Sequence, residues 1–333
     1  IYIKFFEKSC QLSLLTEEDR RPQELFTIIR PIQRESVPCC DHGHILSCVE
    51  VRVSPEVLTS RNDIIINNVS LSFTNFIPPH ALTYKTDQGD EAVISYNENT
   101  GGIIGTLKTV DGHSFALEAC GGHFIFEEFD LTSFEEEELS DEAEEDFVID
   151  IPPRRPETRV KSGPNEGQRT YSVMFYYTPE FAAATPNIED FIDQVIAETN
   201  QGYVNSEIPV TVTKFCHEEA TVHDTNSSSD LLDNFMNMKG SYEELRNTAD
   251  TAALLALEFS GCGRATTFSY AYGNTVSVTK KSCALGYYSF GHEIGHHFGC
   301  LHNIEQKKND WIPDGHAHLI AKGAADQGYR TIL

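Results

Sequence analysis

The sequence is short of basic residues, of long apolar runs and of methionine. It has 25 Lys and Arg against 51 Asp and Glu, a formal net charge of −26 over 333 residues. Most of such a surface would repel a phosphate backbone or an anionic membrane surface, so we expect no nucleic-acid partner. No apolar run approaches the roughly 20 residues that a membrane-spanning helix needs, so we expect no membrane-spanning segment.

The composition is nevertheless that of a globular protein. Hydrophobic residues make up 40% and aromatic residues 10%, too much packing material for a disordered chain. At roughly 150 residues per domain, the length predicts about two domains.

Cysteine usage favours disulfides in an oxidising compartment. The nine cysteines lack the paired CxxC spacing of a structural zinc site, and disulfides persist mainly in secreted proteins. Glycosylation sequons begin at Asn68 and Asn226 and agree with this reading. The cysteine usage leads us to expect a secreted protein. The chain starts at Ile1 with no signal-peptide pattern, so we expect that any secretion signal has already been removed. The odd count leaves one thiol over if all the others pair.

One acidic stretch divides the sequence. Residues 127–150 hold thirteen acidic residues and no Lys or Arg, and a Pro- and Arg-containing segment follows at 151–156. Charge repulsion should keep this region extended and solvated. We therefore predict a domain at 1–130, a linker at 131–168 and a second domain at 169–333. An acidic surface loop inside a single domain is the alternative.

The two halves differ in pattern. Short apolar or alternating runs at 92–96, 102–107, 113–117 and 124–126, separated by Gly-containing turns, predict a small antiparallel sheet before the linker. After the linker we expect strands at 171–177, 208–215, 263–270 and 275–279 and helices at 188–199 and 230–238, while 252–259 fits either type. The second half is therefore predicted to be a mixed α/β domain.

Residues 289–302 read SFGHEIGHHFGCLH and carry the chemistry. His292 and His296 are four residues apart, so on a helix their rings share one face and can bind a single ion. Glu293 lies beside the first ligand, where it can accept a proton from a metal-bound water without being a ligand. Gly299 can end the helix with a positive φ, so that His302 supplies a third nitrogen. Three nitrogens leave zinc one open position for water, as in a catalytic site.

The full spacing is more specific than HExxH alone, which arises by accident in many helices. Given 22 Gly and 13 His in the chain, Gly299 and His302 would both fall at these positions by chance about once in 400. An apolar stripe of Phe290, Ile294 and Phe298 gives the same segment a helical face to bury.

At these residues the sequence resembles the metzincin zinc endopeptidases, whose signature HExxHxxGxxH is matched from His292 to His302. The runs GCGRA at 261–265 and SCALGYYSF at 282–290 resemble the reprolysin, or adamalysin-like, branch over about residues 170–333. The resemblance implies an α/β (α+β) catalytic domain with a mixed sheet and an active-site helix. It also implies that Gly263, Arg264 and Ala265 belong to a sheet-edge strand that binds extended peptide. An ordinary edge strand is the alternative.

The match has one departure. Metzincins carry a methionine turn below the metal, but the three methionines here are Met174, Met236 and Met238. Residues 328–333 resemble the approach to that turn, with Leu333 where methionine would stand. We expect either a fragment, with further C-terminal domains outside it, or a substitution by Leu.

The first half resembles, more loosely, a reprolysin-type propeptide, so the resemblance implies a small β-rich propeptide domain. Many such proenzymes are kept latent by a cysteine thiolate on the zinc. Cys120, flanked by Gly121 and Gly122, is the candidate here. A disulfide or simple burial of Cys120 is the alternative. Release of the propeptide would require a cut, for which Arg154-Arg155 or Arg159 are candidates.

These observations predict a secreted zinc metalloendopeptidase proenzyme that hydrolyses protein or peptide substrates, with Glu293 as the general base. A catalytically inactive zinc-binding relative, acting as an adhesion or inhibitory module, is one alternative, and a zinc hydrolase of non-peptide substrates is another. His297 lies about 100° round the helix from His296 and is expected to be packed or hydrogen-bonded. His316 and His318 are weaker candidates for a metal ligand.

Overall fold

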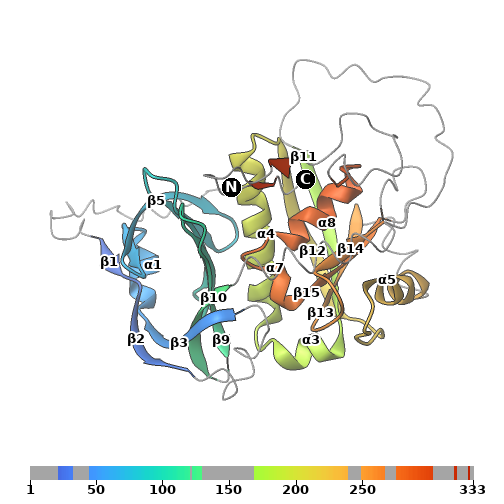
Figure 1. Cartoon of the computed structure of the whole chain (residues 1–333), viewed down its shortest axis with the longest axis horizontal. Helices are drawn as coiled ribbons and strands as arrows, with labels where there is room; N and C mark the ends of the chain where they lie inside the picture. The colour runs from blue at the N-terminus through green and yellow to red at the C-terminus, as the bar shows by residue number, and fades with distance from the viewer. Residues whose placement is uncertain are drawn as a thin grey trace, which may run out of the picture.

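The protein is a mixed α/β structure built on two main sheets (Figure 1). The computed structural model describes residues 22–32, 45–120, 122–129, 169–238, 249–266, 275–302, 319–320 and 329–330. The first sheet belongs to the part before the predicted linker, here called the N-half (22–129). The second belongs to the C-half (169–302). The short pair β16 (Leu319–Ile320) and β17 (Tyr329–Arg330) follows.

The N-half is a ten-stranded sheet with one short helix. Its strand order is β1-β4-β5-β6-β7-β8-β9-β10-β3-β2. β1 pairs with one end of the sheet and β2 with the other, although only Leu25 separates them in the chain. The sheet is thus closed by a single chain segment, which leaves fewer free strand edges. The elements are β1 (Gln23–Glu24), β2 (Phe26–Pro31), β3 (Ile45–Val53), α1 (Pro55–Ser60), β4 (Ile64–Ile66), β5 (Val69–Ile77), β6 (Ala81–Lys85), β7 (Glu91–Asn97), β8 (Gly102–Lys108), β9 (Ser114–Cys120) and β10 (His123–Phe129).

Alternation along these strands gives the sheet two buried faces. On β8, Ile103 and Leu107 join the N-half core together with Val57 and Leu58 of α1. Ile104, between them, joins the core of the C-half instead. Because side chains alternate across a strand, one strand serves both cores.

The C-half is a five-stranded sheet with helices on both faces. Its order is β12-β11-β13-β15-β14, parallel except for β14, which pairs antiparallel with β15. In Figure 1, α4 stands between this sheet and the N-half. The elements are β11 (Arg169–Tyr177), α3 (Pro179–Ala184), α4 (Ile188–Asn205), β12 (Val210–Glu219), α5 (Ser228–Asn237), β13 (Thr251–Ala256), β14 (Gly263–Ala265), β15 (Val276–Lys280), α7 (Lys281–Ala284) and α8 (Ser289–His297).

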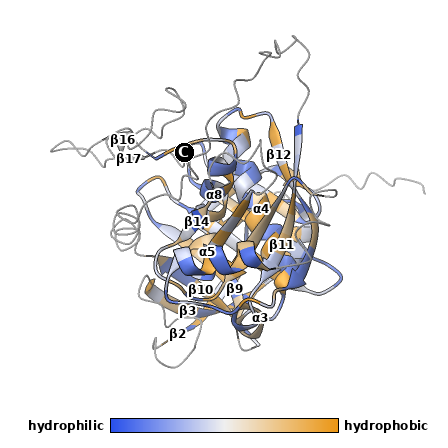
Figure 2. Ribbon diagram, turned by 90° about the vertical axis from the view of Figure 1, so that its right-hand side faces the viewer, coloured by the Kyte–Doolittle hydropathy of each residue, from blue (hydrophilic) through white to orange (hydrophobic). Residues whose placement is uncertain are grey.

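Local sequence explains where two of these helices begin. The Thr178 side chain accepts a hydrogen bond from the Phe181 amide and Pro179 follows it, so α3 starts there. The Ser227 side chain caps α5 in the same way. In Figure 2, α5 carries both hydrophobic and hydrophilic colours. Its Leu231, Leu232 and Phe235 are buried and Asp233 is exposed, as in an amphipathic helix.

The secondary structure expected from sequence is largely confirmed in the described residues. The four N-half runs are β7 to β10, within a sheet that is larger than expected and antiparallel except for the β1–β4 pair. The segment 252–259, which fitted either type, contains β13, a fully buried parallel strand. The strand expected at 263–270 is seen as β14, and residues 267–274 lie outside the described part. The boundaries at 130 and 168 stay predictions.

The two halves are in direct contact along α4. The Gln194 amide donates to the Val93 carbonyl at 2.8 Å in a buried bond. The buried Asp190 carboxylate accepts from the Asn97 amide at 2.8 Å and from the Thr100 hydroxyl at 3.1 Å. Through these contacts and Ile104, the N-half packs directly against α4 and the core of the C-half.

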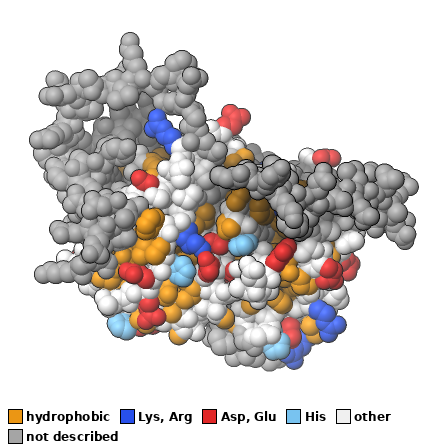
Figure 3. All heavy atoms as spheres, turned by 180° about the vertical axis from the view of Figure 1, so that it is seen from behind, with side chains coloured by type: hydrophobic (Ala, Val, Ile, Leu, Met, Phe, Trp, Pro, Cys, Tyr) orange, Lys and Arg blue, Asp and Glu red, His pale blue; other side chains and the backbone are white. Residues whose placement is uncertain are grey.

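Among the described residues, no helix is long and apolar enough to cross a membrane. Acidic side chains are dispersed among other types over the described part of the face in Figure 3. The strongly acidic stretch at 130–150 lies outside the described residues.

A buried carboxyl group at the contact between the halves should make stability depend on pH. Burial raises the pKa of Glu127 well above 4.5, the nearby Glu118 carboxylate adds to the rise, and Lys281 opposes it. At a pH below about 4.5, the pKa of Glu127 in the unfolded chain, the carboxyl group is protonated in both the folded and the unfolded state. Its burial then does not lower the free energy of unfolding. As the pH rises towards the folded pKa, the unfolded chain ionises more readily, so the free energy of unfolding falls.

We therefore expect Glu127→Gln to raise the free energy of unfolding at pH 8 by on the order of 1 kcal/mol. The gain should disappear at pH 4, because the wild-type carboxyl is then neutral. Urea unfolding at several pH values measures this. Glu128→Gln is the matched control, because the Glu128 carboxylate already pairs with His113 at 2.6 Å and should show no such gain. A gain from Glu127→Gln that is the same at pH 4 and pH 8 would contradict this explanation.

Candidate metal centre and active site

The helix α8 carries the candidate site and has a defined start and end. It follows a turn in which Gly286 and Tyr288 have φ values of +73° and +63°. It ends where Gly299 adopts a φ of +91°, with the Gly299 amide donating to the His296 carbonyl at 2.9 Å. The positive φ is what the spacing predicted for Gly299. The chain then turns back over the helix.

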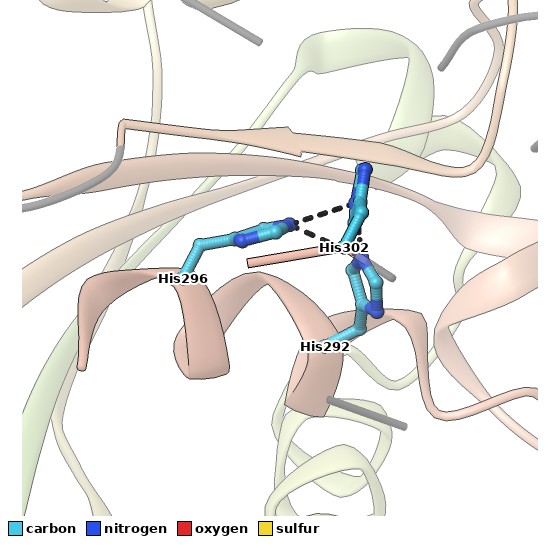
Figure 4. A group of neighbouring side chains, drawn as sticks. All are labelled: His292, His296 and His302. Carbon is cyan, nitrogen blue, oxygen red and sulfur yellow. Dashed lines mark hydrogen bonds between the residues drawn. The ribbon is translucent and has the colours of Figure 1, made fainter. Parts of the chain in front are cut away.

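This reversal brings the three histidines together (Figure 4). The Nε2 atoms of His292, His296 and His302 lie 3.1 Å from one another. Among the described residues, they are the one group of three His, Cys, Asp or Glu side chains close enough to hold a metal ion. His292 and His296 project from α8, and His302 reaches them from the segment after it.

The donor chemistry fits a metal ion. His296 donates its Nδ1 hydrogen to the Cys300 carbonyl at 2.8 Å, which leaves Nε2 as the unprotonated nitrogen that can bind a metal. In a tetrahedral site with Zn–N bonds of about 2.0–2.1 Å, two ligand nitrogens are separated by about 3.3 Å. The observed spacing of 3.1 Å is close to this value. The arrangement of these three residues therefore fits a metal ion.

Glu293 is buried beside the triad. The residue is 4% exposed, and its carboxylate lies against Gly263, where a Cβ atom would be 2.3 Å from Oε1. Gly263 is the first residue of β14, which forms an edge of the five-stranded sheet. The structure therefore places the expected edge strand directly beside the expected general base.

The three edge-strand residues do not all face the site. Gly263 meets Glu293 of α8, whereas the Arg264 side chain reaches the Ser228 hydroxyl at the start of α5, at 3.4 Å. Ala265 is buried. Only the Gly263 face of β14 is thus turned towards α8, as strand alternation requires.

His297 is packed away from the triad, as expected. It is 4% exposed and its Nδ1 lies 3.1 Å from the Thr251 hydroxyl. Burial lowers its pKa to about 4, so it is neutral at physiological pH. His316, His318 and Leu333 lie outside the described residues, as do Arg154, Arg155 and Arg159.

The expectation that Cys120 supplies a latency thiolate is wrong for this structure. Cys120 is disulfide-bonded, and a sulfur in a disulfide is not the thiolate that binds zinc. The free thiols among the described cysteines are Cys216, which is exposed, and Cys300, which is partly buried. Cys262 and Cys283 form a disulfide, in line with the cysteine usage. The odd number of cysteines suggested one unpaired thiol, but Cys120 is not that thiol.

The turn that leads into α8 is held by groups that the sequence did not single out. The buried Glu198 carboxylate accepts from the Gly286 amide at 3.0 Å. Lys108 of the N-half places its ammonium 3.3 Å from the centre of the Tyr288 ring. Ser114, also from the N-half, donates to the Gly286 carbonyl at 3.2 Å. No spacing rule connects residues so far apart in the chain.

Comparison with known proteins identifies the C-half. The sequence model of Metallo-peptidase family M12 matches residues 167–333, half of the chain, and its match contains the histidine triad. The chain belongs to this metallopeptidase family. Members of a metallopeptidase family use a bound metal for peptide hydrolysis, which agrees with the triad.

Two relatives and one solved structure are also similar to this chain. A protein named peptidyl-Asp metalloendopeptidase from Stenotrophomonas maltophilia (strain R551-3) is 26% identical over 256 residues, 74% of this chain and 60% of that protein. One of the same name from Xanthomonas campestris pv. campestris is 31% identical over 43% of this chain and 34% of its own length. The chain thus spans less than two thirds of these relatives. The structure of metalloproteinase-II from Bacteroides fragilis matches 73% of this chain and 75% of its own chain, at 15% identity. Its TM-score of 0.35 is too low to support an argument.

Proposed function

We propose that the protein is a zinc-dependent metalloendopeptidase. The observation that carries the proposal is the convergence of three histidine Nε2 atoms at 3.1 Å, with Glu293 next to the first of them on the same buried helix. When bound, zinc supplies a Lewis acid that lowers the pKa of its water and polarises the scissile carbonyl. Three histidine ligands leave the open position that this chemistry needs.

The residues of this chain perform the remaining tasks. His292, His296 and His302 would hold the ion, and the Cys300 carbonyl keeps His296 in the tautomer with Nε2 unprotonated. Glu293 accepts the proton of the attacking water and passes it to the leaving amine. Strand β14 forms one end of the five-stranded sheet, where an extended peptide could add as a further strand.

Substrate and precursor state form the finer part of the proposal. The names of the relatives lead us to expect cleavage beside aspartate. The sequence leads us to expect a secreted precursor that is processed in the segment 131–168. Since Cys120 is in a disulfide, any latency has to come from another contact.

Metal removal tests the proposed function. The purified chain should contain about one zinc ion and should cleave casein, before or after limited proteolysis in the segment 131–168. Dialysis against a chelator should abolish cleavage, because the ion supplies the Lewis acid, and added zinc should restore it. Peptides that differ only by Asp or Asn at one position test the specificity. Cleavage by metal-free protein would refute the assignment, and a zinc-loaded protein that is inactive in both forms would instead be the non-catalytic relative.

A further inference from the structure

The Glu293 carboxylate occupies the space that a side chain on Gly263 would need. A Cβ atom on Gly263 would lie 2.3 Å from Oε1, 2.8 Å from Cδ and 2.9 Å from Cγ of Glu293. Such distances are well inside van der Waals contact. The two residues are thirty positions apart in sequence, and Glu293 can keep this conformation only while residue 263 has no side chain.

Gly263 is a glycine for reasons of space and not of backbone angle. Its φ is not positive, unlike the φ values of Gly261, Gly286 and Gly299 nearby. Its backbone conformation is that of an ordinary strand residue, paired with Thr279 of β15. An L-residue such as alanine could therefore adopt this backbone. The three atoms nearest to an added Cβ all belong to Glu293, so this side chain is what makes the position unsuitable for a larger residue.

Neither backbone can move aside to relieve such a contact. The residue before Gly263 is tied to α7 by the Cys262–Cys283 disulfide, and its carbonyl accepts from the Lys280 amide at 2.9 Å. On the other side, Phe290 and Ile294 anchor α8 and are fully buried. A methyl group at 263 would therefore change the side-chain torsions of Glu293.

We propose that Gly263 is a positioning residue whose missing side chain lets the Glu293 carboxylate lie against the edge strand. The catalytic consequence rests on the proposed function, whereas the steric relation does not. A general base has to stay within hydrogen-bond reach of the water it deprotonates. A displacement of about 1 Å can cost on the order of 100-fold in rate.

The steric relation can be tested without any activity. Gly263→Ala should lower the thermal unfolding midpoint by several degrees in the wild-type background and by much less in the Glu293→Ala background. The second substitution removes all three Glu293 atoms that the new methyl would meet. An equal loss in both backgrounds would overturn the proposal. If Gly263→Ala does not fold, recovery of folding in the double variant supports the proposal, and failure to recover refutes it.

The catalytic consequence is read from kcat and KM on an active wild-type preparation. Gly263→Ala should lower kcat about 100-fold, leave KM within a few-fold and retain the bound zinc. Gly105→Ala is the matched control, because its Cβ would press on Ile94 and Val93 of the N-half at 3.0 Å and not on α8. The control should lose stability and keep its kcat. An unchanged kcat in Gly263→Ala would refute the positioning role, while an inactive wild type would refute the proposed function and leave the stability test decisive.

Discussion

Replacing Glu293 with Gln should leave the metal bound and lower kcat by about 10²–10⁴-fold. The amide has the size of the carboxylate, so it fits the same space against Gly263, but it cannot accept the proton of the attacking water. The three ligand nitrogens belong to other side chains, so metal binding should persist. The expected loss is therefore one of proton transfer and not of the site itself.

Three measurements on one preparation separate these effects. They are kcat on a peptide substrate, zinc content and the thermal midpoint. Glu180→Gln is a suitable control, because Glu180 is a carboxylate that pairs with His223 at 2.8 Å on the surface and should leave kcat unchanged. Full activity in Glu293→Gln would exclude Glu293 as the general base. Loss of zinc from this variant would show that Glu293 helps to hold the ion.

The triad could be predicted from sequence because its geometry is local. A spacing of four places His292 and His296 on one face of a helix, and a glycine three residues later allows the chain to turn back with His302. All of this depends on fourteen consecutive residues. The structure adds the Cys300 carbonyl as the partner of His296, which sequence could not show because any residue can supply a carbonyl.

Contacts between distant segments could not be predicted in the same way. Lys108 and Glu198 each resemble ordinary charged residues in sequence, yet burial lowers the pKa of Lys108 to about 8 and raises that of Glu198. The glycines next to Cys120 predict a thiol that can approach a metal closely. Whether its sulfur is free depends on pairing with another part of the chain, for which sequence offers no rule.

The N-half should remain attached after the chain is cut between residues 131 and 168. A separable propeptide would bury little of its own core against the enzyme. Here Ile104 of β8 belongs to the C-half core, and Val93 and Ala81 pack against Ala197 of α4. Separation would expose these apolar groups to water at roughly 25 cal/mol per Å².

Polar groups add to the cost of separation. Asp190 would lose its partners Asn97 and Thr100, and Glu198 would lose the ammonium of Lys108, the charge that most offsets its burial. Separation would exchange the hydrogen bonds of the Asp190 carboxylate for bonds to water, and a hydrogen bond to a charged group contributes about 1.5–3 kcal/mol net. The attachment is non-covalent, since the four cysteines of the C-half are accounted for by the Cys262–Cys283 bond and two free thiols.

The expected result is that limited proteolysis in the segment 131–168 yields two fragments on a denaturing gel and one particle on size-exclusion chromatography. Ile104→Asp, which places a charge in the C-half core, should make the cut fragments separate. Val110→Asp, at a residue that is 65% exposed, should leave them together. Release of the N-half from the wild-type protein by the cut alone would show that the contacts along α4 are weaker than their burial implies. Retention would mean that the N-half supports the turn before α8 in the cleaved protein as well. Any effect of the cut on the proposed activity would then arise while Lys108 and Ser114 still contact that turn.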